Sequence, residues 1–586
     1  METILGIDLG TTNSVVSVIL DGQPVVLPEK DPQAILPSIV GLSNNGDLLV
    51  GEEARNQALI APERTVKSVK RQMGSDDKVS LGERQYSPQE VAAMIVRALK
   101  QRAEQALGQS IDKAVITVPA FFSENQRLAT REAGELAGLE VVRIINEPTA
   151  ATLVYEPHTD RNEKLLVYDL GGGTFDVSIV QIERGVVEVL SSHGNTHLGG
   201  DDFDQLLLDV VCDSFHDEHG LDLRDIPTAR SRLLQAVETA KKQLSDEAIV
   251  TVAEEFIAEK DGSPMNLQME LERRDYEDLI EPLLNKTLEC VDAALTDASL
   301  VASQLDRVVL VGGSTRTPMV RRLLQEQLDH EAHLEVDPDL CVSMGAAVQG
   351  GLIAGIDVGP VLVDITPHTL GIRCVGLLHG VETNKMFSPV ITRNTPLPAT
   401  RSEIYFTGYD GQDAAHIEVY QGEHEDATYN QAVGDFLLED LNESASAGNE
   451  ILVRFDLNLD GILTIAAVER DTGNENQLTI DNAITRFRAE NHEAAKAKLA
   501  EVFGSDFDDM TSEVAGASDE SQSQFSEATD MIAKARRLIS QATDEDAEEM
   551  RQLVEDLQAA IQSGVADRVQ PVQDDLSDLV FYLEDA

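Results

Sequence analysis

The sequence predicts a multidomain chain in which an α/β region is followed by an antiparallel β region and then by an α-helical region. Its 586 residues are enough for several folding units. Up to about residue 356, short apolar runs such as 113–120 and 307–313 alternate with helical patterns, which is typical of α/β organisation. From 367 to 482 the runs are short and alternate between apolar and polar residues. Beyond 483 the chain is acidic and its apolar residues recur at helical spacing.

Two segments illustrate how the elements are predicted. Residues 124–139 predict a helix, because apolar residues recur on one face before a strand begins at Val141: Ala129, Ala133, Leu136 and Leu139. In the β region, the run at 451–469 contains Asp460-Gly461 near its centre. This dipeptide favours a tight turn, so the run predicts a β-hairpin.

Composition limits the class of partner. The chain has 46 Lys and Arg residues against 104 Asp and Glu residues, a formal net charge of −58, so its surface repels polyanions. We therefore exclude nucleic acid and anionic membranes as partners. No apolar run approaches the roughly 18 residues that span a bilayer, and no basic leader opens the chain, so we expect a soluble cytoplasmic protein. The four cysteines match no metal spacing, and we expect reduced core thiols: Cys212, Cys290, Cys341 and Cys374.

One pattern occurs twice in the α/β region. Residues 4–15 and 165–178 each hold an apolar strand that ends in Asp-Leu-Gly and continues into Gly and Thr. Such a turn exposes backbone N–H groups and hydroxyls, which suit phosphate oxygens. Asp8 and Asp169 occupy equivalent positions, and two carboxylates beside a polyphosphate would repel it unless Mg²⁺ lay between them. The repeat therefore predicts a metal-nucleotide site between two related lobes.

A third glycine-rich turn follows another apolar strand, at 309–318. Three such turns in one α/β region are much more specific than one. The chain lacks the GxxxxGK[ST] pattern, and no GxGxxG opens a helix after a strand. A P-loop site and a dinucleotide-binding fold are therefore unsupported.

Taken together, these motifs resemble the seventy-kilodalton heat-shock chaperone family, DnaK-type, within the actin-like and sugar-kinase-like ATPase superfamily. The matching segments are GIDLGTTNS (6–14), VKRQMG (69–74), VITVPAFF (115–122), RIINEPTAA (143–151), DLGGGTFDVS (169–178), THLGGDDFD (196–204), ETAKKQLS (238–245), VGGSTRTP (311–318) and DPDLCVSMGAAVQG (337–350). The resemblance covers essentially the whole chain and is strongest before residue 370. It implies an actin-like, duplicated ATPase domain (1–356), an apolar interdomain linker (357–366), an antiparallel β-sandwich substrate-binding domain (367–482) and an α-helical lid (483–586).

The resemblance implies a site that hydrolyses ATP to ADP with Mg²⁺. Lys70 would supply positive charge near the γ-phosphate, Glu147 and Thr174 would complete the hydrolytic site, and Asp8 and Asp169 would act there by holding Mg²⁺ through its waters. Asp176 is placed near the nucleotide by resemblance alone. The residues that would bind ATP are Gly10, Thr11, Thr12, Asn13, Gly171, Gly172, Gly173, Gly200, Glu238, Lys241, Lys242, Ser245, Gly312, Gly313, Ser314, Arg316 and Asp339.

Simpler interpretations of single residues stay open at this point. Lys70 is also compatible with a solvated surface lysine. Glu238 and Lys242 stand four residues apart, the spacing of an ordinary ion pair on a helix.

The part of the chain after the ATPase region decides between two functions. A β domain and a helical region that follow an apolar linker suit an ATP-gated chaperone of unfolded or extended polypeptides. By resemblance, four residues would line the peptide channel, although they also suit a plain β core: Ile372, Val375, Ala415 and Ile417. The alternative is an actin-like or sugar-kinase-like ATPase with an unrelated C-terminal module.

Coupling between the two regions is expected to depend on the linker. Val361, Leu362 and Val363 would dock on the ATPase region in one nucleotide state. By resemblance, Asp364 with Arg143 and Asn146 would form the surface used by J-domain co-chaperones, Pro119 would take part in the coupling, and a nucleotide exchange factor is a further expected partner.

Some features depart from the family pattern. The chain is short between Met73 and Pro88, and Ala415 stands where a larger aliphatic residue is usual. The segment 443–450 lacks the arginine that usually latches the lid, and the acidic stretch at 505–524 interrupts the expected lid helix.

Overall fold

The computed structural model describes most of the chain up to residue 479 and little beyond it. The described residues are 2–29, 34–155, 162–183, 185–333, 337–356, 358–442, 444–479, 495–496, 498–500, 502–503, 552–554, 557 and 576. The chain divides into two compact units, residues 1–499 and 500–586. The helical region predicted at 483–586, including the stretch at 505–524, lies almost entirely outside the described residues.

The first half of the α/β region is built on a sheet of order β11-β10-β1-β2-β3, with β4 paired to β2. Its strands are β1 (Ile4–Asp8), β2 (Asn13–Leu20), β3 (Gln23–Leu27), β4 (Leu36–Pro37), β10 (Lys113–Val118) and β11 (Glu140–Asn146). β1 and β2 form an antiparallel hairpin, and β10 runs parallel to β1 on its other side. The turn of this hairpin carries the first Asp-Leu-Gly motif.

The second half repeats this design in a sheet of order β18-β17-β12-β13-β14-β19. Its strands are β12 (Glu163–Leu170), β13 (Phe175–Glu183), β14 (Val186–Asn195), β17 (Arg307–Val311), β18 (Ala332–His333) and β19 (Val361–Val363). β12 and β13 form the antiparallel hairpin, and β17 runs parallel to β12. The sequence repeat is therefore a repeat of topology.

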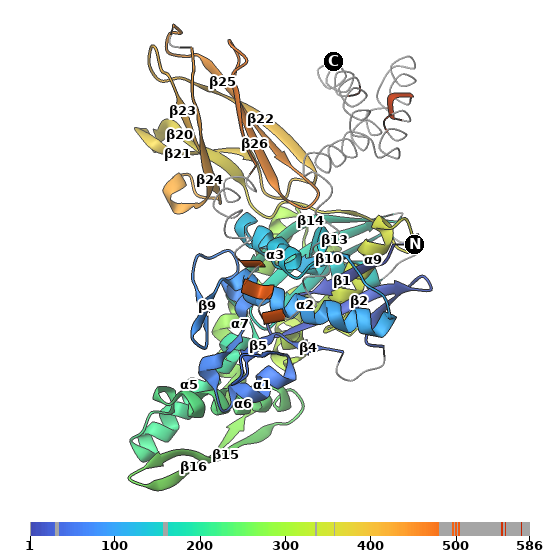
Figure 1. Ribbon diagram of the computed structural model, residues 1–586, viewed down its shortest axis with the longest axis vertical. Helices are drawn as coiled ribbons and strands as arrows, with labels where there is room; N and C mark the ends of the chain where they lie inside the picture. The colour runs from blue at the N-terminus through green and yellow to red at the C-terminus, as the bar shows by residue number, and fades with distance from the viewer. Residues whose placement is uncertain are drawn as a thin grey trace. The chain divides into compact units, whose positions relative to one another are not determined.

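The α-helices of this region pack against the two main sheets, against the small sheets or against one another. They are α1 (Glu52–Ala58), α2 (Pro88–Leu107), α3 (Glu124–Leu136), α4 (Glu147–Tyr155), α5 (Gly200–His219), α6 (Pro227–Gln243), α7 (Arg273–Asp297), α8 (Pro318–Leu328) and α9 (Cys341–Ile353). Figure 1 shows α9 close to β1 and β10. α9 also packs on α4, and a Cβ on Gly345 would lie 1.7 Å from the carbonyl oxygen of Ala150, so this contact requires glycine. One apolar cluster with Ile4, Val167 and Ala346 joins both halves.

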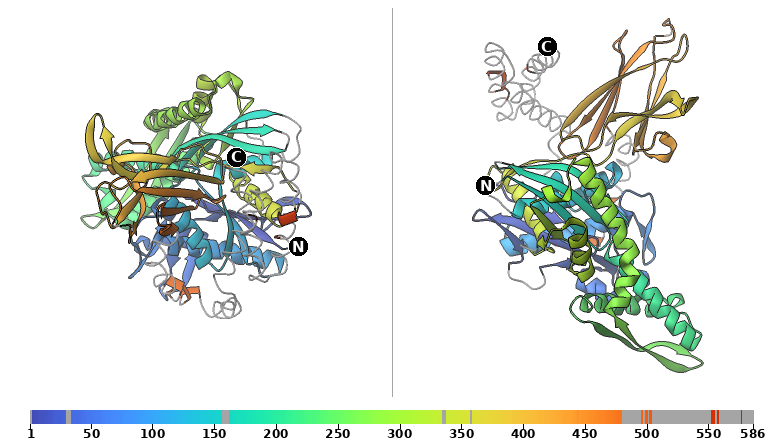
Figure 2. Two further views of the ribbon diagram at one scale, coloured as in Figure 1. Left: turned by 90° about the horizontal axis from the view of Figure 1, so that it is seen from above. Right: turned by 180° about the vertical axis from the view of Figure 1, so that it is seen from behind.

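Smaller elements extend from this core. The short helices are η1 (Pro62–Arg64), η2 (Val69–Gln72), η3 (Leu223–Asp225), η4 (Ala302–Gln304), η5 (Gly313–Arg316) and η6 (Ala427–Tyr429). The small sheets contain β5 (Ile39–Leu42), β6 (Leu48–Val50) and β7 (Thr65–Lys67), then the hairpin of β8 (Val79–Leu81) and β9 (Arg84–Tyr86), and the hairpin of β15 (Ile249–Lys260) and β16 (Ser263–Glu272). The short segment between Met73 and Pro88 thus holds a single small hairpin. Figure 2 shows α7 as a long helix in its right-hand view.

The region after β19 is a sandwich of two antiparallel sheets (Figure 1). One sheet has the order β21-β20-β23-β24 and the other β22-β25-β26-β27. The strands are β20 (Leu370–Leu378), β21 (Val381–Ile391), β22 (Ala399–Phe406), β23 (Ala415–Gln421), β24 (Gln431–Leu438), β25 (Glu450–Leu457), β26 (Leu463–Glu469) and β27 (Glu475–Thr479). Residues of both sheets, such as Val419 and Val453, share one buried core.

The predicted hairpin at 451–469 is confirmed. β25 and β26 pair antiparallel, with Leu457 opposite Leu463, and Gly461 in the turn has a φ of +78°. The helix predicted from residue 124 is confirmed too, and it ends at Leu136.

Among the residues that the structure describes, no helix is long and apolar enough to cross a membrane. All four cysteines are free thiols. Cys212 and Cys341 are buried as expected, whereas Cys290 and Cys374 are only half-buried.

Candidate nucleotide site

The two Asp-Leu-Gly turns meet across a cavity of about 770 Å³. Their contact is close: a Cβ on Gly172 would lie 1.8 Å from Oγ1 of Thr12, so the second turn can approach the first only with glycine there. The N–H of Gly171 donates to the carbonyl of Thr174 (3.0 Å), which closes the second turn. The repeat therefore places two donor-rich turns on facing walls of one cavity.

The residues predicted to form the nucleotide site come together in this cavity, with one exception. Those that line it are Asp8, Gly10, Thr11, Thr12, Asn13, Lys70, Glu147, Asp169, Gly171, Gly172, Thr174, Gly200, Glu238, Lys241, Lys242, Ser245, Gly312, Gly313, Ser314, Arg316 and Asp339. The exception is Gly173, where a Cβ would lie 2.6 Å from the side chain of Thr11. Gly173 thus belongs to the contact between the two turns. Asp176, which the resemblance places near the nucleotide, is buried on β13 and is also outside the lining of the cavity.

Lys70 and Glu147 form a buried ion pair at the base of the cavity. Lys70 comes from η2 and its side chain is 3% exposed, while Glu147 is the first residue of α4. The Lys70 ammonium also lies 5.8 Å from the centre of the Phe122 ring. The interpretation of Lys70 as a solvated surface lysine is therefore wrong, because its charge points into the protein.

Carboxylates crowd together beside this pair. Burial, followed by the nearby charge of Glu147, raises the pKa of Asp8 to about 7. The same two causes raise the pKa of Asp169 well above its ordinary range and that of Asp176 to about 7. Thr117 donates a hydrogen bond to Asp8 (3.3 Å). One lysine cannot balance the negative charge of these carboxylates. A divalent cation would supply the missing positive charge.

Asp8 and Asp169 offer carboxylate oxygens, the kind of ligand that magnesium prefers, to the same cavity. Within the described part of the chain, no group of three or more His, Cys, Asp or Glu side chains is arranged to ligate a metal directly. Asp8 and Asp169 stand on the two repeated hairpins and both line the cavity. Carboxylate oxygens that hold an ion through its waters are a common arrangement for magnesium.

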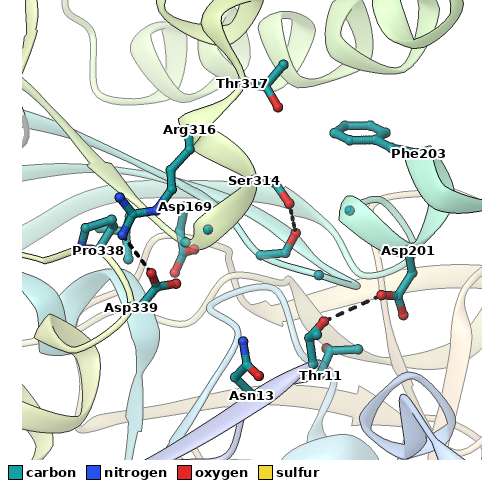
Figure 3. A pocket seen from close by; sticks show the side chains of 18 of the residues that line it. Thr11, Asn13, Asp169, Asp201, Phe203, Ser314, Arg316, Thr317, Pro338 and Asp339 are labelled. Carbon is teal, nitrogen blue, oxygen red and sulfur yellow. Dashed lines mark hydrogen bonds and ion pairs between the residues drawn. The ribbon is translucent and has the colours of Figure 1, made fainter. Parts of the chain in front are cut away.

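The opposite side of the cavity is lined by residues from α6 and η5. Glu238 and Lys242 form the ion pair that their spacing allowed (2.5 Å), yet both also line the cavity. Lys241 is held by Asp204 at 2.9 Å. Figure 3 shows Arg316 joined to Asp339 (2.7 Å), and the same guanidinium reaches Asp337 at 3.1 Å. The charged planar group is therefore fixed at the cavity wall.

The third glycine turn approaches the second directly. Gly312 has a φ of +82°, and a Cβ there would lie 2.4 Å from the carbonyl oxygen of Leu170. The Ser314 hydroxyl donates to the carbonyl of Gly171 (2.8 Å). Backbone, rather than side chain, thus forms this part of the wall.

Sequence reasoning missed several lining residues: Ile35, Asp201, Phe203, Asp204, Asp246, Val311, Thr317, Pro318, Arg321, Pro338 and Val342. Asp201, Phe203 and Asp204 fall inside the quoted motif at 196–204, so that motif was a usable signal. Arg321, on α8, and Ile35, just before β4, have no distinctive local pattern, and only the fold brings them to the cavity.

The apolar linker residues form an edge strand. β19 pairs parallel with β14, so Val361 lies opposite Val186, and Leu362 packs against the apolar cluster of the α/β region. Val361 itself is 62% exposed. Asp364 accepts a hydrogen bond from Asn146 (2.9 Å), and Pro119 is buried two residues before Phe121.

Asp460, read from the sequence only as a turn residue, also contacts the α/β region. Its carboxylate binds Arg131 at 2.6 Å and Arg143 at 3.1 Å and accepts the N–H of Ile144 (3.4 Å). Arg143 is therefore occupied by the β sandwich in this arrangement. A second cavity, of about 320 Å³, lies beside these residues and is lined in part by Leu362, Asp364 and Leu459.

The four predicted peptide-channel residues differ in exposure. Ile372 and Ile417 are buried in the sandwich core, Ala415 packs against that core, and Val375 is 68% exposed. Their assignment to a channel stays a prediction.

Comparison with known proteins identifies the family. The family model described as Hsp70 protein matches residues 4–584. The chain is also 45% identical, over 486 residues, to the protein named Chaperone protein DnaK of Thermotoga petrophila, a match that covers 82% of this chain and 80% of the relative. Because the family match continues to residue 584, the alternative of an unrelated C-terminal module is wrong. The chain belongs to the Hsp70 family of ATP-hydrolysing molecular chaperones.

Proposed function

We propose that the cavity between the two repeated hairpins binds ATP and hydrolyses it, and that this cycle gates binding of exposed hydrophobic segments of unfolded polypeptides by the β sandwich. The observation that carries the proposal is the convergence of both Asp-Leu-Gly turns, the Lys70–Glu147 pair and Arg316 on one cavity of about 770 Å³. Its N–H-rich turns suit a polyphosphate, and its opposite wall offers charged side chains and exposed backbone to a nucleoside.

Within this cavity, hydrolysis would depend on positioning. Lys70 is held by Glu147, so its ammonium has a fixed place from which to orient a water molecule toward the terminal phosphate. Thr174 stands in the turn that lines the same space. Asp8 and Asp169 would hold Mg²⁺ through its waters, and the bound ion would neutralise charge on the phosphates.

The β sandwich would hold the polypeptide, with Ile372, Val375, Ala415 and Ile417 contributing apolar contacts. β19 would pass the nucleotide state to it, since this strand is an edge strand that can leave β14 without disrupting the rest of its sheet. J-domain co-chaperones would act at Arg143, Asn146 and Asp364, and a nucleotide exchange factor would open the cavity. A cytoplasmic location stays a prediction.

The test is peptide binding in two nucleotide states. A fluorescein-labelled, leucine-rich peptide is bound by the full chain with ADP and Mg²⁺, and its anisotropy is followed after ATP is added. We expect ATP to accelerate peptide release by at least tenfold. Adding more ADP in place of ATP should not accelerate it. Peptide release at the same rate in both nucleotides would refute gating.

A further inference from the structure

Phe121 uses both of its main-chain groups to join the nucleotide region to the β sandwich. Its N–H donates to the Asp176 carboxylate (3.0 Å). Its carbonyl accepts a hydrogen bond from Nε2 of His368 (3.1 Å), which lies just before β20. One residue in the loop between β10 and α3 therefore connects a carboxylate of β13 to a side chain of the sandwich region.

The Asp176 end of this connection responds to the charges of the nucleotide cavity. Asp176 is 1% exposed and stands opposite Asp169 in the register of β12 and β13. Its pKa is shifted by burial first and then by Glu147, and Lys70 also acts on it. Asp176 therefore joins the strand pair that carries Asp169 to the main chain of Phe121.

The His368 end is held by ring contacts. The His368 ring meets the Phe121 ring edge to face, with 4.3 Å between centroids. On β14, the His193 ring stacks with Phe121 at 6.1 Å and an interplanar angle of 24°. The Phe121 ring thus has two histidine neighbours, His368 and His193.

A second contact region fixes the same part of the sandwich. Asp297, the last residue of α7, binds His193 (2.8 Å), Arg393 (2.8 Å) and Asn394 (3.0 Å). Arg393 and Asn394 follow β21, so they belong to the sandwich. The His368 hydrogen bond therefore lies beside an ion pair that holds its surroundings in place.

The hydrogen bond of His368 indicates which ring nitrogen carries the proton. Nε2 faces a carbonyl oxygen, so it must carry the N–H in the neutral ring. Burial lowers the pKa of His368 to about 4, and the charges that face it are Arg127 on α3, Glu423 after β23 and His193 on β14. The bond is thus a neutral N–H donor to a carbonyl at ordinary pH.

We propose that His368 is a positioning residue that couples the nucleotide cavity to the seating of the β sandwich, through the main chain of Phe121 and the carboxylate of Asp176. Seating here means contact of the β sandwich with the α/β region through the bonds of His368, Arg393 and Asn394. The inference rests on the proposed ATP-gated cycle and deepens it, because it names a hydrogen-bonded path by which the cavity and the sandwich regulate each other. The two ends bind the peptide groups on either side of the Phe121 Cα.

Two matched variants of the full chain separate the hydrogen bond from the packing. His368→Gln keeps an N–H donor at the position of Nε2, whereas His368→Phe keeps a ring against Phe121 and removes the donor. We expect H368F to slow ATP-driven release of the fluorescein-labelled leucine-rich peptide about five- to tenfold, because a partly buried carbonyl loses its partner. H368Q should stay within twofold of wild type.

The pH profile gives a readout that packing alone would not move. In the seated state His368 has a pKa of about 4, but once released it returns to about 6.5, so seating loses favour as pH falls below about 6.5. The quantity compared is the acceleration of peptide release by ATP in wild type, divided by the same acceleration in H368Q. We expect this ratio to fall about tenfold between pH 7.5 and 5.5. The ratio cancels the titration of Glu124 and of the other groups that the two chains share.

Peptide affinity in the presence of ADP and affinity for ADP itself are measured for every variant, and both should equal wild type if the domains fold. Wild-type release rates in H368F would overturn this inference but not the proposed function. An equal slowing of release in H368F and H368Q would do the same. A wild-type chain that fails to release peptide with ATP would overturn the proposed function and the inference together.

Discussion

Lys70 and Glu147 form an ion pair although 77 positions separate them in the sequence. Neither side chain could be buried alone, because an unpaired charge in this environment is costly. Each therefore fixes the other. Glu147, at the start of α4, sets where the Lys70 ammonium lies, and η2 places Lys70 in the cavity that the two glycine turns line. The pair ties the positions of η2 and α4 to one point in the cavity.

The first prediction follows from this pair. Lys70→Met should lower the rate of ATP hydrolysis by about 10²–10³-fold, a typical effect of removing one fixed donor from developing charge. ATP affinity should change much less, because the glycine turns and the opposite wall stay in place. Single-turnover hydrolysis and a direct nucleotide-binding assay measure the two effects separately.

Two further variants make this result specific. Lys70→Met leaves Glu147 buried without its partner, so the double variant Lys70→Met/Glu147→Gln, which removes both charges, should regain stability without regaining hydrolysis. Lys78→Ala, an exposed lysine in the next loop, is the control and should hydrolyse ATP like wild type. Near-normal hydrolysis in Lys70→Met would contradict the assigned role.

The α/β halves could be predicted because their evidence is local. Each Asp-Leu-Gly turn carries its own strand pattern and glycine signal, and the β25–β26 hairpin carries its own turn dipeptide. Arg321 and Ile35 could not be found this way, because they reach the cavity only through the packing of separate elements. The same limit applied to Asp460, whose turn was correctly predicted but whose contacts depend on the placement of two regions.

The second prediction concerns β19. Replacing Val361, Leu362 and Val363 with Asp should leave ATP binding intact and abolish peptide-stimulated ATP hydrolysis. Leu362 packs on the apolar cluster, and burying such side chains contributes about 1.5–3 kcal/mol each when complete. That is a useful fraction of the ~5.5 kcal/mol that moves a two-state equilibrium from 1:99 to 99:1. Steady-state hydrolysis with and without peptide is the measurement.

Val301→Asp provides a matched control for this experiment. Val301 is 60% exposed, close to the 62% of Val361, but it lies before η4 and outside the linker. It should retain full stimulation by peptide. If the linker variant is stimulated as strongly as Val301→Asp, docking of β19 does not carry the signal.

The third prediction concerns Asp460. Asp460→Asn removes the charge from two ion pairs with Arg131 and Arg143, and charge-assisted hydrogen bonds contribute about 1.5–3 kcal/mol each. The seated state of the sandwich should therefore lose at least tenfold in population. Hydrogen exchange reports this directly, because the N–H of Ile144 donates to the Asp460 carboxylate. We expect faster exchange across β11 in the presence of ATP.

Asp471→Asn is the control for that variant, since Asp471 lies in the exposed turn after β26. Its exchange across β11 should match wild type. Unchanged protection of β11 in Asp460→Asn would mean that the two arginines hold the sandwich without this carboxylate.

The fourth prediction concerns Glu124, the first residue of α3. Its side chain is 5% exposed, and burial raises its pKa to about 7, opposed in part by Arg127. The folded chain therefore binds a proton between pH 4.5 and 7 that the unfolded chain does not, so this residue lowers stability as pH rises through that window. Glu124→Gln should raise the melting temperature at pH 8 by several degrees and change it little near pH 5.

Calorimetry of the full chain across this pH range measures the effect. Glu83→Gln, in the exposed turn between β8 and β9, changes the net charge equally and should track wild type at every pH. The difference between the two variants therefore isolates burial of the Glu124 carboxyl from the general repulsion within a chain of net charge −58. Identical pH dependence in the two variants would show that Glu124 does not carry the raised pKa, and that its seat against Gln421, whose side-chain oxygen accepts the Glu124 N–H, is open to water.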